Sequence, residues 1–372
     1  MNTKINLKKI VAISLLIIAT SFSLTVFAQK EVIYSSDWGE KLPSFPNHLI
    51  LKSNVVFVHE DMTMTCDSAV FNTEENLINA YNNIHIYQDT LHLYGDEFIY
   101  DADTKIAEIF GDTVTLYDNN TTLQTDYMVM DREAQTVRYT THAYIWDEEN
   151  TLESELGTYL IDTKIFEFTK EVKLNSPQVN ILSDSLFYES KTDIARFYNK
   201  TDITTKDSVK IYTSQGFYNT KTDDATLFKD NLIISDSKHL IADSIYYNTK
   251  TENAKAFRNI FIKDSVNQII AYSHYLEKDK KGEIPYIYLT TDLLLQQIEE
   301  QDTLHLHCDS VWIYFDTTMK AENMYAYNHV KFFRQDMQGV SDLLHYDVKD
   351  SLVYFLGLPV LWSEENQFTA DT

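Results

Sequence analysis

The sequence contains few of the residues on which several protein classes depend. Its 372 residues include 8 Gly, 5 Pro and 2 Cys. Collagen, glycine-rich calcium repeats and most glycine-loop nucleotide folds need far more glycine, so the composition excludes them. Two cysteines cannot build a disulfide scaffold.

Basic residues are also scarce, since 31 Lys and Arg face 56 Asp and Glu, for a net charge of −25. Proteins that bind a nucleic-acid backbone need clustered cations, so we expect no nucleic-acid partner. Residues that build a core are plentiful, however, with 25 Tyr, 20 Phe and 44% hydrophobic residues overall. This composition predicts a folded chain despite the charge.

The N-terminus has the three parts of a secretory signal peptide. Three lysines precede an apolar segment at residues 10–19, and Val26-Phe27-Ala28 provides a cleavage motif. These features predict a signal peptide at residues 1–28 and an exported protein. An uncleaved anchor is the alternative, because the apolar stretch at 10–28 is just long enough to span a bilayer.

A recurring acidic position organises the rest of the chain. It follows a small residue and precedes an alternating apolar segment, and most copies lie 29 or 30 residues apart. The position is held by Asp67, Asp96, Asp126, Glu155, Asp184, Asp243, Asp309, Asp342 and Asp371, with Ser214 and Tyr272 in the remaining copies. Such a period predicts one elongated array of stacked copies instead of separate domains.

The local pattern within each copy has a period of two. Segments such as 113–117 and 209–212 read as short strands, and clusters of Asn, Asp and Thr such as 219–224 read as turns. The small residue before the acidic position implies a close approach of neighbouring backbone. The chain is therefore predicted to be all-β, with turns built almost without glycine.

The array has recognisable limits along the chain. We predict a lead-in at 29–48, repeats at 49–276, an insertion at 277–303 and a continuation at 304–372. Within the insertion, residues 293–300 are expected to form one or two helical turns and 278–281 an exposed loop. The sequence stops at Asp371-Thr372, just inside an eleventh copy, so the natural protein either continues or ends within a motif.

The repeated motif resembles the LptA/OstA family, the organic-solvent-tolerance domain of periplasmic lipopolysaccharide-transport proteins. The clearest copy runs from Gly95-Asp96-Glu97-Phe98-Ile99-Tyr100-Asp101 to Ala107 and Val114, and the resemblance covers about 49–372. It implies an elongated antiparallel two-sheet β-jellyroll, or "taco", whose apolar groove shields lipopolysaccharide acyl chains. It also implies a periplasmic location, with association with the outer membrane as one option. The implied partners are Lpt-type β-jellyroll proteins, or a second copy, joined through edge strands.

The groove has candidate residues two and four positions after the acidic position. Both positions point to the same face of a strand. The residues expected to contact lipid are Phe71, Phe98, Tyr100, Met128, Met130, Tyr159, Leu186, Tyr188, Tyr218, Ile245, Tyr247, Ile313, Leu344 and Tyr346. The same face suits a filled core equally well, and the tyrosine hydroxyls need polar partners at its rim.

Other candidate chemistry has simpler explanations. His305 and His307 point to one face of a strand and Cys308 to the other, so we expect no metal site. Cys66 and Cys308 occupy the same small position in distant copies and cannot form an internal disulfide. An acid in every copy is more simply a structural residue than a glycosidase carboxylate. No catalytic residues and no cofactor are therefore expected.

Three functions stay open from the sequence. The first is a non-enzymatic lipopolysaccharide carrier in outer-membrane assembly. The second is a structural or adhesive surface β-solenoid with a filled core, and the third is a carbohydrate-active β-helix enzyme.

Overall fold

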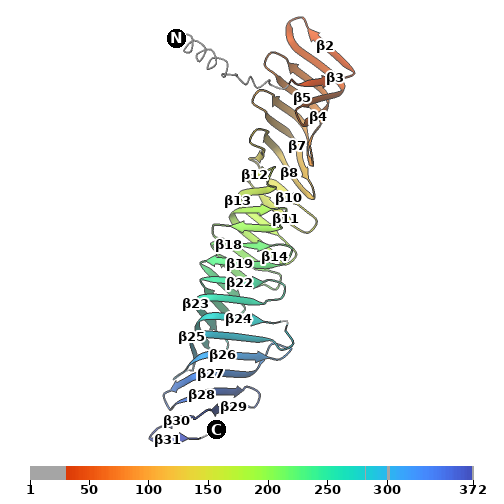
Figure 1. Ribbon diagram of the computed structural model, residues 1–372. Helices are drawn as coiled ribbons and strands as arrows, with labels where there is room; N and C mark the ends of the chain where they lie inside the picture. The colour runs from red at the N-terminus through yellow and green to blue at the C-terminus, as the bar shows by residue number, and fades with distance from the viewer. Residues whose placement is uncertain (1–30, 281, 300–301, 371–372) are drawn as a thin grey trace, which may run out of the picture.

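The computed structural model describes residues 31–280, 282–299 and 302–370. In these residues all strands, β1 to β31, join in one antiparallel 31-stranded sheet. Figure 1 shows them stacked one after another into a long body. The predicted all-β antiparallel class is confirmed, whereas the repeat length stays a prediction. The predicted signal peptide at 1–28 lies outside the described residues.

The first half of the body contains β1 (Ile33–Ser35), β2 (Trp38–Leu42), β3 (Phe45–His59), β4 (Met62–Asn72), β5 (Leu77–Gln88), β6 (Leu91–Asp101), β7 (Ile106–Asp118), β8 (Thr121–Asp131), β9 (Thr136–Tyr139), β10 (Ala143–Trp146), β11 (Thr151–Ser154), β12 (Leu156–Leu160), β13 (Ile165–Asn175), β14 (Val179–Glu189) and β15 (Ile194–Phe197). The second half contains β16 (Thr201–Thr205), β17 (Lys210–Thr213), β18 (Gln215–Asn219), β19 (Asp224–Lys229), β20 (Asn231–Ser235), β21 (Lys238–Ala242), β22 (Ser244–Asn248), β23 (Ala254–Asp264), β24 (Ile269–Asp279), β25 (Tyr286–Ile298), β26 (Thr303–Phe315), β27 (Ala321–Arg334), β28 (Met337–Asp347), β29 (Leu352–Leu356), β30 (Val360–Ser363) and β31 (Asn366–Thr369).

Each long strand bends once and contributes to two walls. In β3 the register shifts between Lys52 and Val55, where Ser53 and Asn54 adopt φ of 59° and 50°. The bends divide the sheet into two parts. We call the part that contains residues 48–52, paired with 68–72, the first wall. We call the part on the other side of the bends, which contains residues 55–59 paired with 62–66, the second wall. Burial alternates in both halves of β3, so each wall turns alternate side chains towards a shared interior.

Aromatic contacts across the interior show that the two walls face each other. Phe57 of the second wall lies 5.8 Å, between ring centroids, from Phe71 of the first wall. Near the other end, Phe332 and Phe355 lie 5.0 Å apart in the same way. The sheet is therefore folded over its own apolar faces along the length of the body.

The recurring acidic residues lie at the bends. The Asn83 side chain donates a hydrogen bond to Asp67 Oδ2 at 2.7 Å, and Asn259 donates to Asp243 Oδ2 at 3.0 Å. These asparagines are among the residues with left-handed backbone, where φ is 53° and 49°. The acid thus stabilises the bend, which gives its recurrence a structural explanation.

The small residue before the acid lies where the two walls meet. At Gly95 an added Cβ would lie 2.6 Å from Ile109 Cγ2 and 3.1 Å from the Phe110 carbonyl oxygen. The first distance is shorter than a carbon atom tolerates, and the second is tighter than most carbon contacts. The close approach that the sequence predicted at this position is therefore present.

Pairing in β23–β26 differs from the sequence-based assignment. Ser273 lies opposite Ile260 at the bend, and His274 lies 3.6 Å from Asp292. His274 therefore occupies the recurring position that the sequence analysis gave to Tyr272. The assignment was wrong by two residues because this copy has a longer spacing.

The segment predicted as an insertion belongs to the sheet. β25 pairs along most of its length with β24 and β26, and Leu293 is fully buried. Residues 293–298 are strand and not the helical turn that we expected, because non-local pairing decides their conformation. Lys278 and Asp279, expected in a loop, belong to β24. β1 and β2, within the predicted lead-in, pair with β3 and extend the sheet.

Candidate functional site

The predicted groove residues all lie on the inner face of the first wall. Most are fully buried, including Tyr100 and Tyr218 at 0% exposure, whereas Ile313 and Tyr346 are half-buried. The prediction thus identified one continuous face of the interior.

The sequence analysis missed the second half of this interior. The inner face of the second wall is equally apolar, and representative buried residues are Phe57, Met64, Leu93, Leu116, Ile181, Ile211 and Leu306. The alternation of apolar residues in segments such as Leu91-x-Leu93 predicts this second inner face. The candidate residues do not include it, because the positions two and four residues after the recurring acid all lie on the first wall.

From β3 to about β22 the interior is filled by side chains. Inward-facing side chains of both walls are almost completely buried there, for example Phe166 and Phe168 of the first wall at 1% exposure and Leu174 of the second wall at 1%. Such burial on both facing walls leaves no room for an acyl chain between them. In this part the two walls are packed together as an ordinary core.

Towards the C-terminal end the interior becomes more accessible. Apolar side chains there pack against the core but are only partly buried. They are Leu240, Ile262, Ile287, Leu295, Leu304, Ile313, Met324, Met337, Tyr346, Phe355 and Leu361. The packing between the walls is therefore graded, from closed near β4 to partly open near β28.

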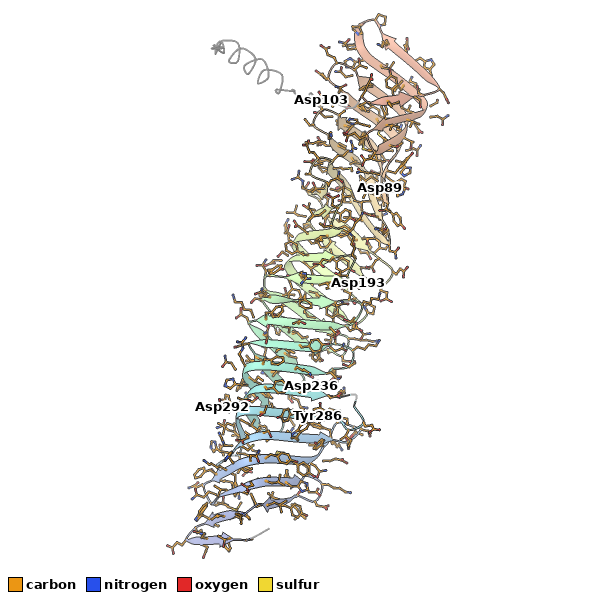
Figure 2. All side chains as sticks on the ribbon, in the orientation of Figure 1. Asp89, Asp103, Asp193, Asp236, Tyr286 and Asp292 are labelled. Carbon is orange, nitrogen blue, oxygen red and sulfur yellow. The ribbon has the colours of Figure 1, made fainter. Side chains whose placement is uncertain are left out.

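The turns of the two walls meet along one side of the body, which we call the seam. Carboxylates such as Asp89, Asp103, Asp193 and Asp236 lie in these turns at successive levels along the body (Figure 2). Several side chains cross the seam and join the walls.

The first bridge across the seam centres on Arg132, whose side chain is 2% exposed. Its Nη2 lies 2.6 Å from Asp61 Oδ1, and its Nη1 donates to the Tyr100 hydroxyl at 2.9 Å. Lys105 forms a parallel ion pair with Glu60 at 3.0 Å. Residues far apart in the sequence thereby tie the edges of both walls together.

The second bridge centres on Asp118, whose side chain is fully buried. It accepts hydrogen bonds from Thr90 at 2.6 Å, from the Tyr159 hydroxyl and from Lys164. Burial alone would raise the pKa of Asp118, but these donors outweigh it and hold the pKa below its ordinary value. Burial and the adjacent Asp118 carboxylate together raise the pKa of Tyr159.

A third contact joins the Tyr188 hydroxyl to Asp147 Oδ2 at 3.2 Å. Nearer the C-terminal end, Lys278 and Lys280 both pair with Glu252. These ion pairs join neighbouring turns of the first wall and do not cross the seam. The seam is thus bridged where the interior is filled.

A family model described as OstA-like protein matches residues 38–184. The matched segment runs from β2 into β14 and contains the Arg132 and Asp118 bridges.

Among solved structures, the chain is similar to LptH from Pseudomonas aeruginosa, described as the LptA homologous periplasmic component of the lipopolysaccharide transport device. The identity is 13%, covering 38% of this chain and 83% of that chain, with a TM-score of 0.19. No curated protein matches the chain.

The histidines and cysteines for which the sequence predicted no function lie on the faces of the strands that alternation assigns to them. His307 points outward from β26 and Cys308 inward, as strand alternation predicted. Both cysteines are free thiols in the buried core, and burial raises the pKa of Cys66 to about 11 and of Cys308 to about 12.

In residues 31–280, 282–299 and 302–370 no three His, Cys, Asp or Glu side chains are grouped to hold a metal. No helix in these ranges has the length and apolar character needed to cross a bilayer.

Proposed function

We propose that this chain is a periplasmic, non-enzymatic carrier that binds lipopolysaccharide through its acyl chains, between the two walls, on the way to the outer membrane. The main support is one apolar cluster that runs without a break from Val32 near β1 to Leu344 in β28. Each buried CH₂ contributes about 0.8 kcal/mol, so several acyl chains would bind strongly without a charged contact. The OstA-like match at 38–184 supports the same function.

The graded packing suggests where lipid would enter. Around Ile313, Leu344 and Tyr346 the apolar interior is already partly accessible, so acyl chains could reach it without a large rearrangement. Around Tyr100 and Tyr159 the walls must first part and the Arg132 and Asp118 bridges must break. The C-terminal third is therefore the proposed first contact, and the remaining predicted residues contact lipid only after the seam opens.

The ends of the sheet suit assembly with similar modules. Within the described part of the chain, β31 pairs only with β30, and β1 and β2 pair only with β3, so each presents an unpaired strand edge. Exposed edges add strands from other chains by β-augmentation. The proposed partners are Lpt-type β-jellyroll proteins or a second copy of this chain.

Site-specific photo-crosslinking in cells tests the proposal. A benzophenone side chain replacing Tyr346 points into the partly open interior, whereas one replacing Tyr325 on the adjacent strand points outward. We expect the first to capture lipopolysaccharide and the second not to. Equal capture at both positions, or none at Tyr346, would falsify interior binding. A third variant at Tyr188 reports whether the bridged part of the seam also opens.

The filled interior from β3 to β22 supports a second candidate, a structural or adhesive β-solenoid. In that case no position in the interior captures lipid, and lipopolysaccharide does not change the thermal stability. A carbohydrate-active enzyme has no comparable support, because acids at the recurring position, such as Asp67 and Asp243, are engaged at the bends.

A further inference from the structure

The outer face of the second wall has a hollow near its C-terminal end. Its volume is about 300 Å³, and its lining includes His305, His307, Lys331, Phe333, Gln338 and Trp362. The register places His307 opposite Lys331 and His305 opposite Phe333 on β26 and β27, and Gln338 opposite Trp362 on β28 and β30. Leu306 and Phe332 alternate with these residues and are buried, so the six named side chains lie on the face away from the interior, although Phe332 also borders the hollow.

This hollow differs in charge from the rest of the surface. Among the described residues no carboxylate lines it, although the chain has 56 acids against 31 bases. Four other hollows on the described surface each include acids: Asp147 and Asp193, Asp230 and Asp243, Asp184 and Asp202, and Glu277 and Asp279. On so acidic a molecule, this lining favours an anionic ligand.

The lining residues provide three kinds of contact. Lys331 is exposed and has no carboxylate partner among the described residues. Gln296 Nε2 lies 3.1 Å from His305 Nδ1 and can only donate to it, which leaves Nε2 as the ring nitrogen that can donate a hydrogen bond. Phe333 is 52% exposed and presents apolar ring surface at the edge of the hollow.

We propose that this hollow binds a sugar that carries a phosphate or carboxylate group. The anion is held by Lys331 and the imidazole donors, the apolar face of the sugar ring lies against Phe333 and Trp362, and Gln338 hydrogen-bonds a hydroxyl. The volume is at the lower limit for small-molecule sites, so it suits about one sugar unit. The site lies outside the walls and does not depend on the proposed interior lipid site.

The test is calorimetric titration of the purified full chain with glucose 1-phosphate, glucose and inorganic phosphate. We expect glucose 1-phosphate to bind about tenfold more tightly than either other compound, because only it engages both the cation and the rings. Lys331→Gln should weaken glucose 1-phosphate binding about tenfold, with an unchanged melting temperature. Phe333→Ala should weaken glucose 1-phosphate but not inorganic phosphate.

Lys263 provides a matched control. It lies opposite His239 on the same outer face, as Lys331 lies opposite His307, but it does not line the hollow. Lys263→Gln should bind glucose 1-phosphate like the unmodified chain. Equal loss in both lysine variants, equal affinity for inorganic phosphate and glucose 1-phosphate, or no binding at all would overturn the proposal.

A second arm distinguishes the two sources of such a sugar. Phosphatidylcholine vesicles that contain lipopolysaccharide are tested with and without excess glucose 1-phosphate, using the unmodified chain and Lys331→Gln. If excess glucose 1-phosphate and the Lys331→Gln substitution each reduce binding to these vesicles, the source of the sugar is a lipid headgroup. Binding to glucose 1-phosphate without any such effect on vesicles identifies a soluble sugar phosphate.

Discussion

At the scale of single residues, the tyrosines combine two functions that explain their abundance. Their rings fill the interior, and several hydroxyls reach polar partners at the seam. Tyr159 donates to Asp118, Tyr188 donates to Asp147, and the Tyr100 hydroxyl accepts from Arg132. Phenylalanine would fill the same space but remove one hydrogen bond from each of these charged groups.

Asp118→Asn tests the buried bridge. Removing this charge leaves Lys164 with a weakened partner, and we expect a loss of about 2–3 kcal/mol in the free energy of unfolding at neutral pH. Because the folded pKa of Asp118 is depressed, its stabilisation is present above the unfolded value near 4 and is lost as pH falls through the folded pKa. The stability difference between the two proteins should therefore shrink below about pH 4.

Denaturant unfolding across the acid range measures this difference. Asp162→Asn, in an exposed turn near Lys164, is the control and should unfold like the unmodified chain throughout. A constant difference between Asp118→Asn and the unmodified chain from pH 7 to pH 2 would contradict the assignment of a depressed pKa.

At the scale of elements, the bends of the long strands determine the architecture. They require left-handed backbone, yet of the chain's eight glycines only Gly357 has such a φ. Residues with a side chain, most often Asn, Asp, Lys, Ser or Glu, occupy the other left-handed positions, for example Lys170 at φ 69° and Glu171 at φ 54°. Side chains with a Cβ are strained there, so the bends are sites where glycine would stabilise the chain.

Lys170→Gly should therefore raise stability, by about 0.5–1 kcal/mol, because it relieves the left-handed strain. Lys173→Gly, three residues later in the paired part of β13, should lower stability by about the same amount, because glycine weakens a strand. Thermal unfolding of both variants gives the comparison. Destabilisation by both substitutions would show that the Lys170 side chain makes contacts worth more than its strain.

At the scale of the whole molecule, the packing changes from one end of the body to the other. Fully buried side chains and seam bridges dominate around β4–β13, and partly buried apolar side chains dominate around β24–β30. The same fold can thus combine a rigid N-terminal part with a more open C-terminal part. This difference is the physical basis for the proposed direction of lipid entry.

Hydrogen–deuterium exchange tests this difference directly. In the free protein, amides of β26–β28 should exchange about tenfold faster than those of β6–β8, because fewer buried contacts oppose local opening. Adding lipopolysaccharide should slow exchange in β26–β28 first. Protection that begins in β6–β8, or uniform exchange along the body, would contradict the proposed entry site.

The sequence by itself determined the properties that depend on local pattern. Alternation and the recurring acid gave the all-β class, and they placed residues such as Phe98 and Tyr100 on one inner face. This worked because a strand has a fixed period of two, so spacing alone decides which side chains share a face. The scarcity of glycine likewise followed from turns and bends made of Asn, Asp and other residues.

Only the tertiary structure decided the properties that depend on distant residues. Pairing with β24 and β26 made residues 286–298 a strand, and the longer spacing in that copy moved the bend to Ser273. Arg132 and Asp61 meet only because the folded sheet closes on itself, and their separation in sequence gives no local signal. Whether the shared inner face is filled or accessible depends on how closely the second wall packs against it, and that packing differs between the two ends of the body.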